Sequence, residues 1–382
     1  MSWDKVKLAD CCLSISDGDH QPPPKAVSGV PFVTIANINK SNQFDFSDTM
    51  FVPKDYYDRL DLKRKAQVGD ILYSVVGSFG IPVLIKEERP FVFQRHIAIL
   101  RPNERINSAF LYYTMLSRDF YAKADAAAIG AAQRTVSLTS LRGMEIELPP
   151  LKVQEAIASK LSVYDNLIEN NQKQIKLLEE AARRLYKEWF VNFRFPGYED
   201  TPIVDGVPEG WERLPVGELI EKIPRTTQIM ASEYGKEGPI PIIDQSREFI
   251  AGYTDNHASL VNVGKPVIVF GDHTRILKYI QFPFAKGADG TQLIVSNTDR
   301  MPQSLFYCSL VGVDLSNYHY ARHFKYLKAE ELLVPTQVIA EAFDHFVSPM
   351  FSKIQRLRDI NKAATNARDR LLPKLISGEI EV

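Results

Sequence analysis

The sequence has few cysteines and no long apolar run. Three cysteines occur in 382 residues, with Cys11 and Cys12 adjacent and Cys308 far away. This spacing fits neither a disulfide framework nor a zinc site, and it suits a reducing compartment. No stretch approaches the ~18 apolar residues of a membrane-spanning helix, and the opening MSWDKVKLADCC lacks the layout of a signal peptide. We therefore expect a cytoplasmic protein without a structural metal.

The sequence also lacks the motifs of several enzyme classes. It contains no GxxxxGK[ST] phosphate loop, no GxGxxG after a strand and no HExxH metal motif. Asp17, Asp19 and His20 lie in one turn and Asp272 and His273 in another, and these are ordinary turn residues. We therefore expect no catalytic residue and no bound metal in this chain.

An excess of positive charge is missing as well. The chain has 46 Lys and Arg against 47 Asp and Glu, a net charge of −1. Proteins that bind nucleic acid alone usually carry a strong positive balance. Bulk charge by itself therefore argues against DNA as a ligand.

What the sequence does contain is an internal repeat, which is the first feature to seek in a long chain. Segments of the first half return in the same order in the second: WDKVKLADCCLSI as WERLPVGELIEKI, GVPFV as GPIPII, VGDILYSVVGS as VGKPVIVFGDH, and AFLYYTML as SLFYCSLV. Each half then closes an apolar stretch with proline, IELPP in the first and ELLVP in the second. The chain therefore consists of two similar halves of related architecture.

Each half is predicted to combine short strands with one long helix. β-branched and aromatic runs bounded by Gly and Pro favour strands, at residues 31–38, 70–76, 83–86, 96–100, 267–270 and 292–296. We predict an α+β fold with two mixed, β-rich globules in tandem, each followed by a long helix. The boundaries are a first globule at 1–149, a helix and linker at 150–209, a second globule at 210–335 and a C-terminal helix at 336–382.

The two helical segments carry a heptad pattern. Apolar residues recur at alternating gaps of four and three from Ile157 to Trp189 and from Phe343 to Leu375. Asn171 is the fifth position of the first series and Asn361 the sixth of the second, so an antiparallel pair with flush ends places them in one layer. We hypothesise an antiparallel coiled coil whose buried asparagine layer fixes the register. The alternative is that each helix packs only on its own globule, with both asparagines solvated.

Loop residues of both globules suit contacts with DNA. Arg, Lys, Asn and Gln make bidentate contacts with base edges, and further cations and hydroxyls contact phosphates. In the first globule the candidates are His20, Gln21, Asn37, Asn39, Arg95, His96, Gln133 and Arg134. In the second they are Arg225, Gln245, Arg247, His273, Arg275, Lys278, His319, Arg322, His323 and Lys325. The segment NYHYARHFKY interleaves aromatics with cations and is the most convincing local patch.

Several segments together resemble a known family. They are IELPPLKVQEAIASKLSVYDNLIENNQKQIKLLEEAARRLYKEWFVNFRFPGYE, the opening SISDGDHQPPP with GVPFVTIANI, the strand and loop VGDILYSVVGSFG, and the terminal RLLPKLISGEIEV. The chain is similar over essentially its whole length to the specificity (S) subunit of a type I restriction-modification system. The match at the first helix covers 148–150, Gln154 and Ile157, whereas Ala340 stands where the second helix would place a glutamine.

The resemblance implies two target-recognition domains that recognise a bipartite, asymmetric DNA sequence with an unspecified gap. It also implies that the helices set this gap and hold two methyltransferase (M) subunits, with restriction (R) subunits in the larger assembly. The chain would then be non-catalytic, with S-adenosylmethionine, Mg and ATP on the partner subunits. Such partners can neutralise phosphates and leave this chain to contact bases, which answers the objection from net charge.

Three other interpretations remain open at this point. One is the specificity chain of a type IIB-like restriction-methylation enzyme, which differs in its partner. Another is a coiled-coil assembly scaffold that does not contact DNA. The third is an enzyme in its own right, which the absence of a cofactor-binding or NPPY-type catalytic segment disfavours.

Overall fold

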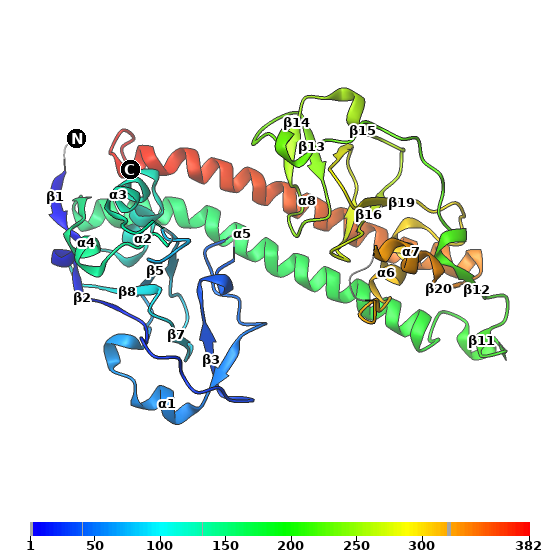
Figure 1. Ribbon diagram of the computed structural model, residues 1–382, viewed down its shortest axis with the longest axis horizontal. Coiled ribbons are helices and arrows are strands. Elements are labelled where there is room, and N and C mark those ends of the chain that lie inside the picture. The colour runs from blue at the N-terminus through cyan, green and yellow to red at the C-terminus, as the bar shows by residue number, and fades with distance from the viewer. Residues whose placement is uncertain (1–2, 40, 132, 319–321) are drawn as a thin grey trace. The chain divides into compact units, whose positions relative to one another are not determined.

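The protein divides into two compact units, each built from a globule and parts of two long helices (Figure 1). The computed structural model describes residues 3–39, 41–131, 133–318 and 322–382. Unit 1 comprises residues 1–171 and 360–382, and unit 2 comprises 172–359. The helices are α5 (Leu151–Tyr186), continued by a π-helical turn at Lys187–Val191, and α8 (Gln337–Ile376). Each contributes a segment to both units.

The globule of unit 1 contains two main sheets. The first has the antiparallel order β2 (Cys12–Asp17), β8 (Ile97–Pro102), β5 (Ile71–Ser74), β6 (Pro82–Leu84). The second has the order β4 (Met50–Val52), β3 (Val30–Val33), β7 (Val92–Phe93), with β3 and β7 parallel. β1 (Asp4–Lys7) and β9 (Glu145–Leu148) pair with each other as a two-stranded antiparallel ribbon. The short helices are α1 (Lys54–Arg59), α2 (Ser108–Leu116), α3 (Arg118–Ala127) and α4 (Leu138–Gly143).

The globule of unit 2 repeats these parts. Its antiparallel sheet has the order β17 (Leu277–Ile280), β16 (Val267–Gly271), β19 (Thr291–Ile294). Its other sheet has the order β14 (Gly252–Thr254), β13 (Ile240–Ile243), β18 (Phe284–Lys286), β15 (Leu260–Val261), with β13 and β18 parallel. The ribbon here pairs β12 (Glu212–Pro215) with β20 (Glu331–Val334), and β10 (Ile203–Val204) pairs with β11 (Val207–Pro208). The helices are α6 (Gln303–Val311) and α7 (His323–Ala329).

The sequence repeat is therefore a repeat of structure. The central antiparallel strands, the parallel pair and the ribbon before each long helix recur in the same chain order. The central strands are buried on both faces: Leu72 packs in one cluster of unit 1 while its neighbour Tyr73 packs in another. This burial explains why these strands are continuous apolar runs without polar alternation. The predicted α+β class, with two β-rich regions each followed by a long helix, is confirmed.

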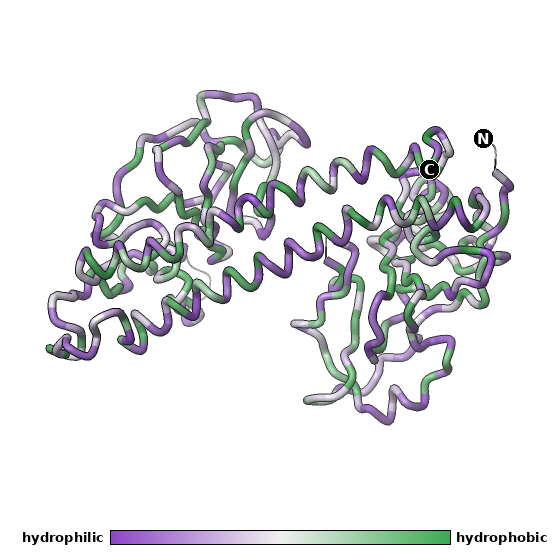
Figure 2. The backbone as a smooth tube through the Cα atoms, turned by 180° about the vertical axis from the view of Figure 1, so that it is seen from behind, coloured by the Kyte–Doolittle hydropathy of each residue, from purple (hydrophilic) through white to green (hydrophobic). Residues whose placement is uncertain are grey.

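The two helices pack against each other within each unit. In unit 1, Ile157 and Leu161 of α5 share a core with Leu372 and Leu375 of α8. In unit 2, Ala182 shares a core with α8 residues that include Phe343, Val347 and Ile354. Apolar and polar stretches alternate along both helices (Figure 2), as expected for helices with one buried seam.

Polar pairs link the helices at fixed points of this seam. Asn171 donates from Nδ2 to Oδ1 of Asn361 at 2.8 Å, and Asn171 is buried. Also in unit 1, Arg368 of α8 pairs with Asp165 of α5 at 2.6 Å. In unit 2, Arg358 pairs with Glu179 at 3.0 Å. From the Asp165–Arg368 pair to the Asn171–Asn361 pair, the residue number rises along α5 and falls along α8. The two helices are therefore antiparallel.

The start of α5 is held by a buried glutamine. Gln154 is 1% exposed, and its Oε1 accepts a hydrogen bond from the Asn107 amide at 2.8 Å. Its Nε2 donates to the carbonyls of Pro149 at 2.8 Å and Arg105 at 3.1 Å. At the corresponding point of α8, Ala340 is fully buried and Arg300 Nε donates instead to the Pro335 carbonyl at 2.8 Å. Across the described ranges, no helix is long and apolar enough to span a membrane.

Candidate nucleic-acid interface

Four loop segments of unit 1 meet at the ends of its buried strands. Asp19 and Gln94 form a β-bridge, and the Arg95 amide donates to the Asp19 carbonyl at 3.1 Å. A Cβ at Gly18 would lie 2.2 Å from the Phe93 carbonyl oxygen, so only glycine permits this close approach. The residues around 19 and 95 are therefore neighbours although they are far apart in sequence.

The loop after β5 joins the same group. The Val75 amide donates to the His96 carbonyl at 2.9 Å, and the Gly77 amide donates to the Arg134 carbonyl at 2.9 Å. Gly77 has a φ of +70°, a conformation that favours glycine. Six of the predicted contact residues of unit 1 thus lie on neighbouring segments: His20, Gln21, Arg95, His96, Gln133 and Arg134.

These six side chains differ in how strongly other groups hold them. Gln21, Arg95 and Gln133 are exposed, whereas His20 pairs with Asp17 at 2.8 Å. Arg134 pairs with Asp125 and lies over the Phe79 ring, 5.5 Å from its centroid. His96 Nδ1 lies 2.6 Å from Gln94 Nε2. Burial and the nearby Arg95 lower the pKa of His96, which favours its neutral form.

Asn37 and Asn39 close turns. Asn37 Oδ1 accepts from the Thr34 amide at 2.8 Å, and its Nδ2 donates to the Asp48 carbonyl at 3.2 Å. Asn39 Oδ1 accepts from the amides of Ser41 and Gln43 at 2.9 and 3.1 Å. Both side chains are therefore occupied in local structure, as is common for asparagine in turns.

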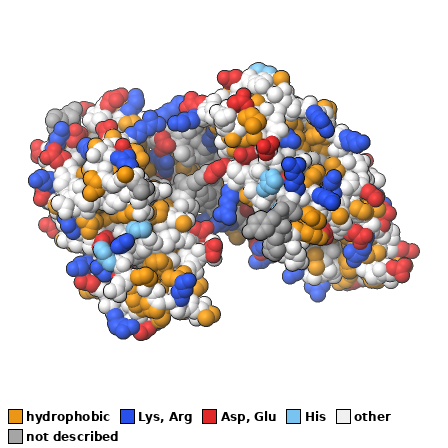
Figure 3. All heavy atoms as spheres, in the orientation of Figure 1, with side chains coloured by type: hydrophobic (Ala, Val, Ile, Leu, Met, Phe, Trp, Pro, Cys, Tyr) orange, Lys and Arg blue, Asp and Glu red, His pale blue; other side chains and the backbone are white. Residues whose placement is uncertain are grey.

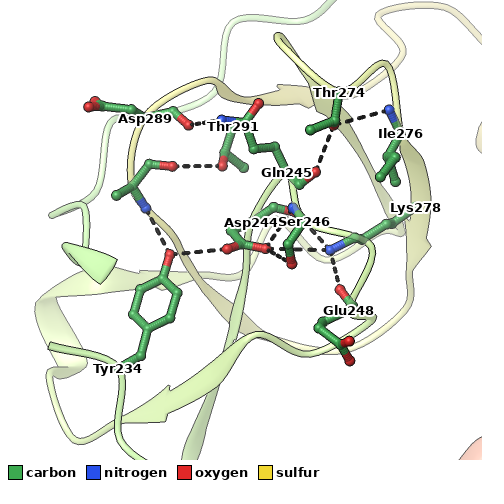
Figure 4. Close-up of polar contacts among 11 residues, drawn as sticks. Tyr234, Asp244, Gln245, Ser246, Glu248, Thr274, Ile276, Lys278, Asp289 and Thr291 are labelled. Atoms are coloured by element: carbon green, nitrogen blue, oxygen red, sulfur yellow. Dashed lines mark hydrogen bonds and ion pairs between the residues drawn. The ribbon is translucent and has the colours of Figure 1, made fainter. Parts of the chain in front are cut away.

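In unit 2, a polar network joins three segments beside the central strands (Figure 4). Asp244 Oδ1 accepts from the Ser246 amide at 2.9 Å and from its hydroxyl at 2.6 Å. Gln245 Nε2 donates to the Asp289 carbonyl at 2.8 Å, and Gln245 Oε1 accepts from the His273 amide at 3.0 Å. The side chain of Gln245 thus bridges two turns and is held in place by both.

A fourth segment is tied to this network at the start of α7. The Asp272 carbonyl accepts from the His323 amide at 2.9 Å, and Asp272 Oδ1 accepts from the Phe324 amide at 2.7 Å. The exposed residues carried by the joined segments include four predicted contact residues, Arg247, His273, Arg275 and Arg322. Arg275 has a φ of +61° and donates to the Leu315 carbonyl at 3.1 Å. Lys325 and Arg225 are also exposed.

Two predicted contact residues of unit 2 are buried. His323 is 6% exposed, with Nδ1 2.8 Å from the Asp272 carbonyl and Nε2 2.9 Å from the Tyr318 carbonyl. Lys278 is 5% exposed and donates to the carbonyls of Asp244 and Glu248. We therefore revise their expected role from base or phosphate contact to support of the loops. His319 lies outside the described residues.

The surface charges around these segments are mixed. Lys and Arg side chains are interspersed with Asp and Glu over the face in view (Figure 3), in keeping with the net charge of −1. Within the described ranges, no three His, Cys, Asp or Glu side chains gather as ligands for a metal ion. Exposed Arg, His and Gln side chains on structured loops are suited to hydrogen bonding with base edges and phosphates.

Comparisons with known proteins fit this architecture. Residues 2–180 match the family model described as "Type I restriction modification DNA specificity domain". The MjaIX specificity subunit of Methanocaldococcus jannaschii is 24% identical over 340 residues, covering 82% of this chain and 78% of the relative. The HindI specificity subunit of Haemophilus influenzae is 22% identical over 475 residues, covering 99% of both chains. The chain belongs to the type I restriction-modification specificity subunits.

A solved structure supports the fold of this specificity subunit. The crystal structure of the S subunit from M. genitalium has a TM-score of 0.60 and 17% identity, covering 98% of this chain and 96% of that one. Its likeness over nearly the full length agrees with the two repeated halves described above. As a specificity subunit, the chain is a DNA-recognition component and not the catalytic subunit of the restriction-modification complex.

Sequence reasoning missed the acidic residues that organise the second site. Neither residue resembles a base-contact residue: Asp244 is not among the candidates, and Asp272 is predicted only as an ordinary turn residue. Each follows a buried strand directly, in the strings PIID and VIVFGD. An acidic residue at a strand end can accept hydrogen bonds from the turn that follows, and this signal would have marked both.

Proposed function

We propose that this specificity subunit recognises a bipartite, asymmetric DNA sequence, with one half bound by each globule. The observation that supports this most is the difference between the exposed side chains on the clustered loops of the two units. Unit 1 carries Gln21, Arg95 and Gln133, whereas unit 2 carries Arg247 and His273. Two similar frames with unlike donors and acceptors are suited to two unlike base sequences.

The proposed partners are double-stranded DNA, two methyltransferase subunits and, in the larger assembly, restriction subunits. S-adenosylmethionine, Mg and ATP would be bound by those partners and not by this chain. Methyltransferase subunits around the DNA would neutralise phosphates, which is consistent with a specificity subunit whose net charge is only −1. The curated relatives are themselves named specificity subunits of type I restriction enzymes.

Methylome sequencing tests the proposal. A host without other methylation systems would express this chain with its modification subunit, and single-molecule sequencing would map methylated bases in the genomic DNA. The expected result is one motif with two specific halves separated by unspecified bases. A continuous motif, or no methylation that depends on this chain, would contradict the proposal.

The helices are proposed to set the gap between the two halves. One heptad adds about 10 Å to a helix at about 1.5 Å per residue. Insertion of seven residues into α5, with a matching insertion in α8, should keep the seam in phase and change the number of unspecified bases. Methylome sequencing of this variant measures the gap, and an unchanged gap would count against the role of the helices as spacers.

A further inference from the structure

The buried ammonium of Lys278 connects β17 to the segment that follows β13. Its Nζ donates to the Asp244 carbonyl at 2.7 Å and to the Glu248 carbonyl, and it lies 3.7 Å from Asp244 Oδ1 (Figure 4). An ammonium has three N–H donors. Two carbonyls accept two of these hydrogen bonds, and the Asp244 carboxylate lies at ion-pair distance. Because Lys278 is only 5% exposed, this enclosed ammonium is not open to a DNA phosphate.

Lys278 lies in a buried strand, so its ammonium needs polar partners inside the protein. Its neighbours in the strand, Leu277 and Tyr279, face the main core of unit 2, while Ile280 belongs to the smaller cluster on the opposite face. Burial lowers the pKa of Lys278 by penalising the charged form, and Asp244 opposes that shift. A buried cation without partners would be costly, so its contacts with residues 244–248 hold those residues close to β17.

The held segment carries an exposed side chain toward solvent. The two carbonyls bound by Lys278 lie four residues apart and enclose Arg247, which is exposed. Ser246 donates twice to Asp244, and Tyr234 contacts Asp244 Oδ2 at 3.5 Å. The backbone of this turn is thus fixed from inside, while Arg247 is free to face a ligand.

We infer that Lys278 is a positioning residue for base recognition by the second globule: it fixes the turn of residues 244–248, and this turn presents Arg247 to the half-site. The inference rests on the proposed function, because it assumes that this globule recognises one half of the DNA sequence. It assigns a specificity-determining segment within that globule. It also assigns Lys278 no direct contact with DNA.

The test compares methylomes and DNA affinities of complexes assembled with variant chains. Lys278→Met keeps an unbranched apolar stem but removes the three donors. We expect the base preference to change or relax in one half of the motif, with the other half unchanged. Arg247→Ala should affect the same half. Lys222→Met, an exposed lysine of the same unit, is the matched control for loss of one positive charge and should leave the motif unchanged.

Salt dependence separates positioning from phosphate contact. A duplex carrying the wild-type motif would be titrated with each complex at several salt concentrations. Loss of one phosphate contact reduces the slope of log K against log salt by about 1, so Lys278→Met should leave the slope unchanged. An unchanged motif, or a slope that falls by about 1, would overturn the inference.

A second variant decides the matter if Lys278→Met does not assemble. Asp244→Asn keeps an acceptor for Ser246 but removes the charge beside Lys278, and it should relax the same half of the motif. If the Asp244→Asn motif equals that of the wild type, the positioning role is refuted. If the wild-type chain itself produces no bipartite motif, the proposed function fails first, and the two failures are thereby distinguished.

Discussion

The two globules share the arrangement of their central strands but hold matching positions with different side chains. The repeat of VGDILYSVVGS as VGKPVIVFGDH aligns Ser74 with Val269, and Val269 pairs with Lys278. In the first globule the residue across from Ser74 is Ile81, so Ile81 occupies the place of Lys278. Ile81 donates its amide to Ser74 Oγ at 2.9 Å, so the first hairpin is closed by a neutral hydroxyl. The second uses a buried cation. A common frame can therefore carry different loops when the buried polar anchor changes.

The junctions before the two long helices show the same contrast between a neutral side chain in unit 1 and a charged one in unit 2. Gln154 is fully enclosed and bonds three backbone groups, whereas Arg300 has a side chain that is 33% exposed and pairs with Glu212 as well as with backbone. Both side chains bind a proline carbonyl before the helix, at Pro149 and Pro335. The backbone arrangement recurs, but the side chain that anchors it is buried and neutral at Gln154, and charged and partly exposed to solvent at Arg300.

The largest effect is expected at the buried anchor. Gln154→Leu should lower the free energy of unfolding of unit 1 by about 3 kcal/mol, because the Asn107 amide and two carbonyls lose buried partners. Denaturant unfolding measures the loss, and amide hydrogen exchange at Asn107 should speed up. Glu155→Ala, an exposed change in the same helical turn, should stay within about 0.5 kcal/mol.

The matching change in unit 2 should lower the free energy of unfolding by less than Gln154→Leu does in unit 1. Arg300→Met should lower the free energy of unfolding by about 1 to 2 kcal/mol, since water can replace part of its contacts with Pro335 and Glu212. The same denaturant experiment applies, with the exposed Arg213→Met as its control. A cost equal to or above that of Gln154→Leu would remove the contrast between the two anchors.

The smallest effect is expected at the asparagine layer of unit 1. Asn171→Leu alone should cost about 1 kcal/mol because Asn361, which is only half-buried, loses its partner. The double replacement of both by Leu should recover this loss, since an apolar pair packs well at a seam position. A double-mutant cycle on unfolding free energies measures the coupling, and additive single effects would mean that the pair is not coupled.

Much of the architecture could be predicted because it depends on periodicity. The heptad spacing placed both long helices within a few residues, and counting along it put Asn171 opposite Asn361, where the structure has them hydrogen-bonded. The internal repeat likewise predicts two globules of related architecture, each followed by a long helix. These features follow from local spacing, which is present in a single sequence.

The candidate interface could be predicted only in part, because burial is decided by distant segments. Lys278 and His323 have the residue types of a DNA contact, yet each is enclosed by carbonyls from segments more than four residues away in sequence. Nothing near Lys278 in the sequence indicates that Asp244 will surround it. Exposed candidates such as Arg95 and Arg247 were found because turn composition alone placed them on the surface.

The most direct test of one half-site per globule is an exchange of recognition domains. Residues 1–149 would be replaced by the matching segment of a relative that assembles with the same modification subunit, and the host methylome would be sequenced. The account predicts a hybrid motif, with one half taken from the relative and the other half and the gap unchanged. A motif altered in both halves, or in neither, would contradict it.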